Sequence, residues 1–112
     1  MKILIAGSRS VQSYDIKQHI DKDVSLIICG GAIGIDSLAE RMADELGISK
    51  LVLRPDYKRY GKAAPLVRNK IMVDLADEVI VIWDGKSHGT AFTLKYAHEQ
   101  KKKVVLVNLS EK

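Results

Sequence analysis

The 112-residue sequence has one cysteine, few aromatic side chains and no long hydrophobic run. The single cysteine, Cys29, excludes an intramolecular disulfide, which agrees with a reducing compartment. The first apolar run ends at Gly7, too early for the hydrophobic region of a signal peptide, and no stretch approaches the length of a membrane span. We therefore expect a cytoplasmic protein with no membrane partner.

The composition is that of an ordinary folded protein. Hydrophobic residues make up 46% of the chain and charged residues 29%, and no low-complexity tract argues for disorder. A chain of this length fits one domain around one hydrophobic core, and a second domain would not fit. We therefore expect residues 1–112 to form a single domain.

The formal net charge of +4 comes largely from two basic stretches. One is Lys101 to Lys103, where lysines at a helix end favour the macrodipole and keep the surface soluble. The other runs from Arg54 to Lys70 and has Tyr57 and Tyr60 among its basic residues, a combination that suits phosphates or bases. Single-stranded nucleic acid is therefore one candidate partner.

Hydrophobic patterning predicts alternating strands and helices. Runs rich in Ile, Val and Leu cover residues 3–6, 25–29, 51–53, 79–83 and 104–107. Helical spacing covers about residues 12–20, 38–46, 62–76 and 90–100, with the weakest pattern in the first segment. Gly47 fits a helix C-terminal cap, and Pro65 fits only the first turn of a helix.

Several of these strands are apolar at successive positions, as strands covered by helices on both faces should be. With right-handed crossovers, the alternation predicts an α/β fold: a Rossmann-like three-layer α/β/α domain. Its five-stranded parallel sheet is expected in the order 3-2-1-4-5.

Unusual residues follow the strands at the edge of the sheet where such folds bind ligands. Glycine lets a backbone approach a ligand closely, and the free N–H groups at a helix start attract anions. Two such loops, after strands one and four, are expected to face each other across one crevice and hold a phosphate. The candidate ligand-binding residues are Gly7, Ser8, Arg9, Gly30, Gly31, Asp36, Arg68, Asn69, Asp84, Ser87, Gly89 and Thr90.

Each of these residues also has a purely structural interpretation. The glycines could simply form tight corners, and Asp36 fits the N-cap of the second helix better than it fits a contact to a ribose hydroxyl. Arg68-Asn69 lies near the start of an apolar helix, and we interpret this pair as a ligand contact in preference to part of a solvent-exposed helix face. Trp83 and Cys29 end buried strands and are interpreted as core residues.

Several kinds of site lose support from the sequence. Neither the P-loop pattern GxxxxGK[ST] nor the dinucleotide pattern GxGxxG is present, which counts against ordinary ATPases and dehydrogenases. The three histidines have no metal-ligand spacing with one another or with Cys29. We assign no metal site and no cofactor.

The motifs resemble those of the SLOG superfamily, which includes the DNA-processing protein A family, the Lonely Guy phosphoribohydrolases and small stand-alone YspA-like proteins. The matching segments are Gly7-Ser8-Arg9, Gly30-Gly31-Ala32-x-Gly34-Ile35-Asp36, Arg68-Asn69-Lys70-Ile71-Met72 and Gly89-Thr90. Tyr60-Gly61-Lys62 and Trp83-Asp84-Gly85 match the stand-alone branch. The resemblance implies a site for a nucleotide or nucleotide derivative that needs no metal, and by analogy a homodimer.

The resemblance does not imply a single activity. Lonely Guy enzymes release a base from nucleoside 5′-monophosphates and carry an arginine, matched by Arg68, and a glutamate in GGxGTxxE. The glutamate position holds Thr93 here, which counts against carrying over the hydrolase activity unless Asp84, Asp36 or Glu99 substitutes. Proteins of the DNA-processing family are larger and have extra domains.

Three functional hypotheses follow. The first is a module that senses or sequesters a phosphorylated nucleoside or an ADP-ribose-like ligand without turning it over. The second is an N-glycosidase acting on a nucleotide, for which the sequence identifies no catalytic residue. The third is a single-stranded DNA-binding module, supported by the stretch from Arg54 to Lys70.

Overall fold

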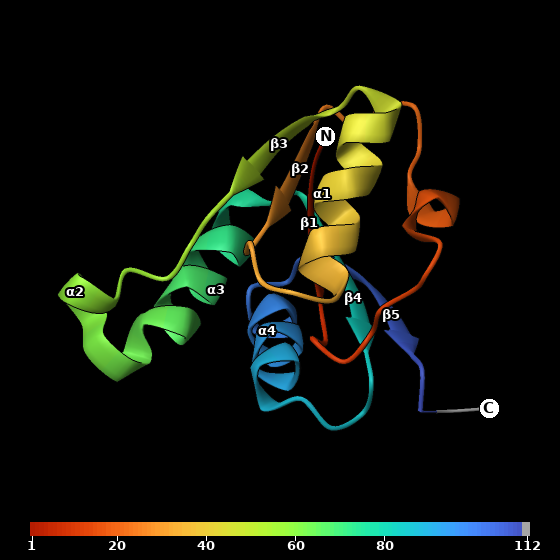
Figure 1. The fold of residues 1–112 in the computed structure, drawn as a ribbon. Coiled ribbons are helices and arrows are strands. Elements are labelled where there is room, and N and C mark those ends of the chain that lie inside the picture. The colour runs from red at the N-terminus through yellow and green to blue at the C-terminus, as the bar shows by residue number, and fades with distance from the viewer. Residues whose placement is uncertain (111–112) are drawn as a thin grey trace.

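In the computed structural model, which describes residues 1–110, five parallel strands form one sheet in the order β3-β2-β1-β4-β5 (Figure 1). The strands are β1 (Lys2–Gly7), β2 (Leu26–Cys29), β3 (Ser49–Val52), β4 (Glu78–Trp83) and β5 (Lys103–Asn108). This confirms the predicted Rossmann-like sheet. Because β1 and β4 pair side by side, the loops that follow them emerge next to each other.

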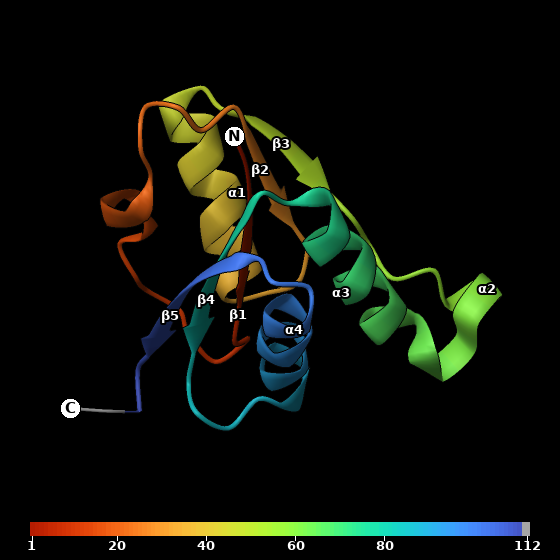
Figure 2. The same cartoon turned by 180° about the vertical axis from the view of Figure 1, so that it is seen from behind.

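Helices cover both faces of the sheet, as Figures 1 and 2 show from opposite sides. α1 (Ile35–Leu46) packs on one face, and α3 (Ala64–Leu75) and α4 (His88–Glu99) pack on the other. The short α2 (Tyr57–Tyr60) and the 3-10 helix η2 (Gly61–Ala63) project beyond the sheet edge. The three-layer arrangement predicted from the sequence is therefore present.

Each face of the sheet has its own apolar core. On the α1 face, Ile5 and Ile27 pack with Ile35 and Ala39. Leu4, Val79 and Val81 belong to the core beneath α3 and α4. This two-sided burial explains why β1 and β4 are apolar at consecutive positions.

The helix predicted over residues 12–20 is wrong, because only a 3-10 turn, η1 (Ile16–His19), forms there. Val11 and Ile16 are buried, but their spacing of five places them on no common helix face. Serine and aspartate side chains in this segment also compete with the backbone for hydrogen bonds. The segment between β1 and β2 is therefore mostly irregular and packs on the core through Val11 and Ile16.

The other elements differ from the sequence prediction mainly at their ends. Most of the helix predicted over residues 62–76 forms α3, its first residues belong to η2, and Pro65 lies in the first turn of α3 as expected. The short α2 before it was not predicted. α4 begins at His88, two residues before the predicted start. Gly47 ends α1 in the left-handed conformation, as predicted. None of the helices within residues 1–110 has the length and apolar character needed to cross a membrane.

Trp83 and Cys29 have structural roles. Cys29 is fully buried at the end of β2, and burial raises the pKa of its thiol to about 12. Trp83 is partly buried against the core beneath α4, and its indole N–H donates to the Ser87 carbonyl at 3.0 Å. Both side chains thus pack with the apolar cores, as predicted.

Candidate functional site

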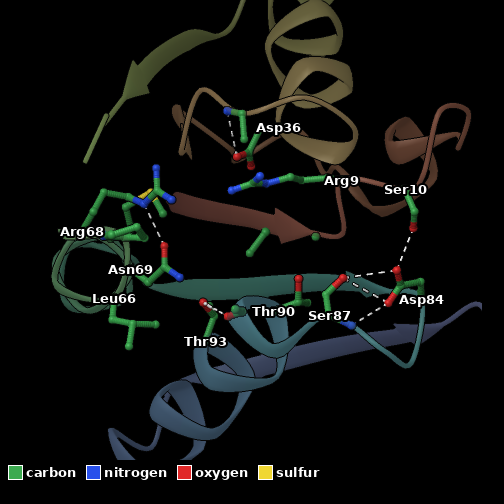
Figure 3. A pocket seen from close by; sticks show the side chains of 16 residues that line it. Arg9, Ser10, Asp36, Leu66, Arg68, Asn69, Asp84, Ser87, Thr90 and Thr93 are labelled. Atoms are coloured by element: carbon green, nitrogen blue, oxygen red, sulfur yellow. Dashed lines mark hydrogen bonds between the residues drawn. The ribbon is translucent and has the colours of Figure 1, made fainter. Parts of the chain in front are cut away.

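A crevice of about 450 Å³ opens at the carboxyl ends of β1 and β4 (Figure 3). Nine of the twelve predicted ligand-binding residues line it: Gly7, Arg9, Asp36, Arg68, Asn69, Asp84, Ser87, Gly89 and Thr90. The structure thus brings together residues from four separate loops and helix starts. The crevice lies at the topological switch point of the sheet, where the strand order reverses direction.

The loops after β1 and β4 are bonded to each other. The Asp84 backbone N–H donates to the hydroxyl oxygen of Ser8 at 3.0 Å, and the Ser10 hydroxyl donates to the Asp84 carboxylate at 2.7 Å. Ser8 is buried and does not line the crevice, so it supports the crevice from beneath. These bonds hold the crevice in shape before any ligand arrives.

Asp84 is occupied in organising its own loop. Besides Ser10, its carboxylate accepts hydrogen bonds from the backbone N–H groups of Lys86 and Ser87 and from the Ser87 hydroxyl. These bonds, led by that of Ser10, hold the pKa of Asp84 far below its usual range. An ionised, fully engaged carboxylate is a poor proton donor, so Asp84 is unsuited to general-acid chemistry.

The N-terminus of α4 presents donors to the crevice. The first helical hydrogen bond runs from the Ala91 N–H to the Ser87 carbonyl, so the N–H groups of His88, Gly89 and Thr90 have no partner inside the helix. Gly89 and Thr90 line the crevice, and the Thr90 side chain is buried in its wall. This end of α4 suits an anionic group.

Arg68 is held in a fixed position by backbone oxygens. Its Nη1 donates to the carbonyls of Gly30 at 2.7 Å and Leu53 at 3.1 Å, and its Nε donates to Asn69 Oδ1 at 2.8 Å. Burial lowers the pKa of Arg68, but a guanidinium stays charged in proteins. Within residues 1–110, no hydrogen-bond partner is found for the remaining nitrogen, Nη2, or for the amide nitrogen of Asn69.

Arg9 supplies a second guanidinium. It is exposed, and Figure 3 shows its side chain extending across the crevice toward Arg68. None of the ion pairs found within residues 1–110 includes Arg9 or Arg68. Two positive groups are therefore directed into one space without a salt-bridge partner.

The predicted N-cap role of Asp36 is wrong, because Gly34 occupies the N-cap of α1. The Asp36 carboxylate instead accepts a hydrogen bond from the Ala32 N–H at 3.1 Å and so closes the glycine-rich loop. Burial raises the pKa of Asp36, while the backbone N–H groups of Ala32 and Gly30 and the charge of Arg68 partly oppose that rise. Asp36 is thus a buried carboxyl that faces the crevice.

Sequence reasoning missed part of the wall. The unpredicted lining residues are Ala6, Ser10, Ala32, Pro65, Leu66, Met72 and Thr93. Leu66 and Met72 looked like parts of an ordinary apolar stripe, yet Leu66 is 41% exposed. An apolar residue two positions before Arg68 was the available signal, but helical periodicity alone does not distinguish core from pocket.

The other candidate carboxylate lies elsewhere. Glu99 is the exposed last residue of α4 and does not line the crevice. Thr93, at the position of the family glutamate, is buried in the wall, and its hydroxyl donates to the Gly89 carbonyl at 3.1 Å. Among the carboxyl groups considered from the sequence, Asp36 alone combines a place in the crevice with a raised pKa.

The basic stretch from Arg54 to Lys70 separates into distinct places. Tyr57, Lys58, Arg59 and Tyr60 are exposed on the projecting α2. Lys70 lies instead on α3, with its ammonium 5.6 Å from the centre of the Tyr96 ring. The stretch is therefore not one continuous surface, and single-stranded nucleic acid binding stays a prediction.

Of the basic residues Lys101 to Lys103, Lys102 acts on a different helix from the one expected. The Lys102 ammonium donates to the carbonyls of Ala76 at 2.7 Å and Asp74 at 3.3 Å, so it caps the end of α3 and not that of α4.

Within residues 1–110, no group of three or more His, Cys, Asp or Glu side chains is arranged to hold a metal ion. Comparison of the chain with family models, with curated proteins and with solved structures gave no match.

Proposed function

We propose that this protein binds a nucleotide or nucleotide derivative in the crevice and holds it without turning it over, as a sensor or a sequestering protein of the SLOG type. The observation that carries the proposal is the meeting of two guanidinium groups, from Arg9 and Arg68, with the free N–H groups at the start of α4. Neither guanidinium forms an ion pair within residues 1–110. Such a combination favours a phosphate over a neutral ligand.

The rest of the wall suits the other parts of a nucleotide. Asp36 and Asn69 offer a carboxylate oxygen and an amide nitrogen to ribose hydroxyls. Pro65, Leu66 and Met72 add an apolar side that a base could contact. A volume of about 450 Å³ lies in the range of small-molecule sites.

Binding without turnover is favoured by the carboxyl chemistry. Asp84 is ionised and fully engaged, and the position of the family glutamate holds a threonine whose hydroxyl is bonded to its own helix. A glycosidic bond breaks readily only when a group donates a proton to the departing base. Neither residue provides such a group.

The test is calorimetric titration of the wild type and of the Arg9→Ala variant with nucleoside 5′-monophosphates. Arg9 is exposed and bonded to no side chain in the described part of the chain, so its removal should leave the melting temperature unchanged. Loss of one charge-assisted contact, worth about 1.5–3 kcal/mol, should weaken binding roughly ten- to 150-fold. Arg41→Ala, which removes an exposed arginine on α1, is the matched control. Failure of every nucleotide to bind, or equal effects of both variants, would overturn the proposal.

One observation favours a second function, that of an N-glycosidase. Asp36 faces the crevice with a raised pKa, as a general acid would. Incubation with nucleoside monophosphates and NAD, followed by chromatography for free base, tests it. Base release that disappears in Asp36→Asn would establish turnover; no release from any substrate would remove the enzyme hypothesis.

A further inference from the structure

A second cavity, of about 330 Å³, adjoins the crevice on the side of β2 and β3. The two cavities share Arg9, Ala32, Pro65 and Arg68 in their walls. The second cavity alone is lined by Arg54, Pro55 and Tyr57. The two cavities therefore adjoin, and Arg9 and Arg68 lie where they meet.

Gly30 and Gly31 hold two arginines in place in the wall of the second cavity. The Gly30 carbonyl accepts a hydrogen bond from Arg68 Nη1 at 2.7 Å, and the Gly31 carbonyl accepts one from Arg54 Nη1 at 2.9 Å. A Cβ added to Gly30 would lie 2.7 Å from Arg68 Nη1, and a Cβ added to Gly31 would lie 2.7 Å from Arg54 Nη1. Gly30 and Gly31 both line the second cavity, and their two successive carbonyls orient two guanidinium groups there.

The charge of the second cavity is strongly positive. Arg9, Arg54 and Arg68 all line it, and every ion pair within residues 1–110 is made by a lysine. Asp36, which lines the first cavity only, is the acidic residue that acts on Arg68. A ligand part carrying negative charge would be bound where the two cavities meet.

The second cavity is also lined by a tyrosine and two prolines. Tyr57, at the start of α2, is 59% exposed, and the prolines are Pro55 and Pro65. An exposed tyrosine in an arginine-lined cavity offers a face on which a ring can stack. A simple phosphate would leave that face unused.

We infer that the ligand is a nucleotide extended through a diphosphate, with one organic group in each cavity and the diphosphate over Arg9 and Arg68. This inference rests on the proposed nucleotide-binding function and narrows its ligand class. Arg54 and Tyr57 then select for the second organic group, while Thr90 and the start of α4 contact the first half.

The test compares matched ligand pairs by calorimetry: AMP with ADP-ribose, and UMP with UDP-glucose. For at least one pair, the extended ligand should bind the wild type about tenfold or more tightly than its monophosphate. Tyr57→Ala should weaken the extended ligand at least about fivefold, the lower end of a stacking contact, and leave the monophosphate within about twofold. Tyr60→Ala, which removes the other exposed tyrosine of α2, should change neither, because Tyr60 does not line this cavity.

The outcomes separate the two proposals. If monophosphates bind and the extended ligands gain nothing, or if Tyr57→Ala affects both members of a pair equally, the second cavity is not a subsite and the inference is overturned while the proposed function stands. If no nucleotide of either kind binds the wild type, both fail. Unchanged melting temperatures of the two tyrosine variants confirm that both are folded.

Discussion

The backbone N–H of Asp84 donates to the Ser8 hydroxyl oxygen at 3.0 Å, across a sequence separation of 76 residues. Ser8 is only 1% exposed, and this bond fastens the loop after β4 to the loop after β1. Because both loops line or support the crevice, its shape depends on a contact inside the protein as well as on any ligand. The crevice is in this sense preformed.

Ser8→Ala should therefore destabilise the protein by about 1–2 kcal/mol, because the Asp84 N–H loses its partner in a partly buried place. Chemical denaturation monitored by circular dichroism measures the change. Ser13→Ala, at an exposed serine of the irregular connection before η1, is the control and should stay within about 0.5 kcal/mol of the wild type. Equal effects of the two substitutions would contradict this role of Ser8.

Three glycine-to-alanine variants should rank by backbone conformation and space. Gly34 has a φ of +76°, and a Cβ there would lie 2.5 Å from the Ser8 carbonyl oxygen, so Gly34→Ala should cost about 3 kcal/mol or more. Gly47 has a φ of +68° but no atom within 4 Å of an added Cβ, so Gly47→Ala should cost about 1 kcal/mol.

Gly89 completes this series as the control. It has neither a positive φ nor an atom within 4 Å of an added Cβ, so Gly89→Ala should change stability by less than about 1 kcal/mol. Since Gly89 lines the crevice, the same methyl should nevertheless weaken nucleotide binding. Denaturation curves and calorimetry separate the two effects. A large loss of stability in Gly89→Ala would show that the start of α4 is packed more tightly than described.

Asp84 should make the protein sensitive to acid. Its pKa in the folded protein lies below the ordinary value of 3.8, so its contribution to stability is present above about pH 4 and is lost as the pH falls toward the folded pKa. The stability difference between the wild type and Asp84→Asn should therefore shrink between pH 5 and pH 2. A difference that stays constant over this range would refute the assignment.

Asp36 should show the opposite dependence. Burial raises its pKa above 3.8, so its contribution is present below that value and is lost as the pH rises through the folded pKa. Asp36→Asn should therefore gain stability relative to the wild type as the pH is raised from 3 to 7. Urea denaturation at several pH values measures the trend, and a relative loss with rising pH would contradict it.

Lys102 should stabilise the end of α3. Lys102→Met removes the hydrogen bonds to the Ala76 and Asp74 carbonyls and should cost about 1 kcal/mol. Lys95→Met, at an exposed lysine of α4, removes the same charge without these bonds and should have little effect. Thermal and chemical denaturation compare the two. Equal losses would indicate that net charge, and not the cap, is responsible.

The amino-acid sequence by itself determined the fold class, the strand order and the edge of the sheet where the unusual residues gather. These follow from apolar runs, glycine and proline positions and right-handed crossovers, which are regular enough to be predicted. The same reasoning failed for residues 12–20, where the apolar residues match no single helix face.

Only the tertiary structure decided which loop residues face the crevice and which hold the loops together. Ser8 lies beneath the crevice and is bonded to Asp84, whereas Gly30 and Gly31 line the second cavity and hold arginines through their carbonyls. Asp36 looked like a helix cap and instead closes a loop. Many of the deciding bonds join residues tens of positions apart, and local sequence patterns carry no information about which distant donor meets which acceptor.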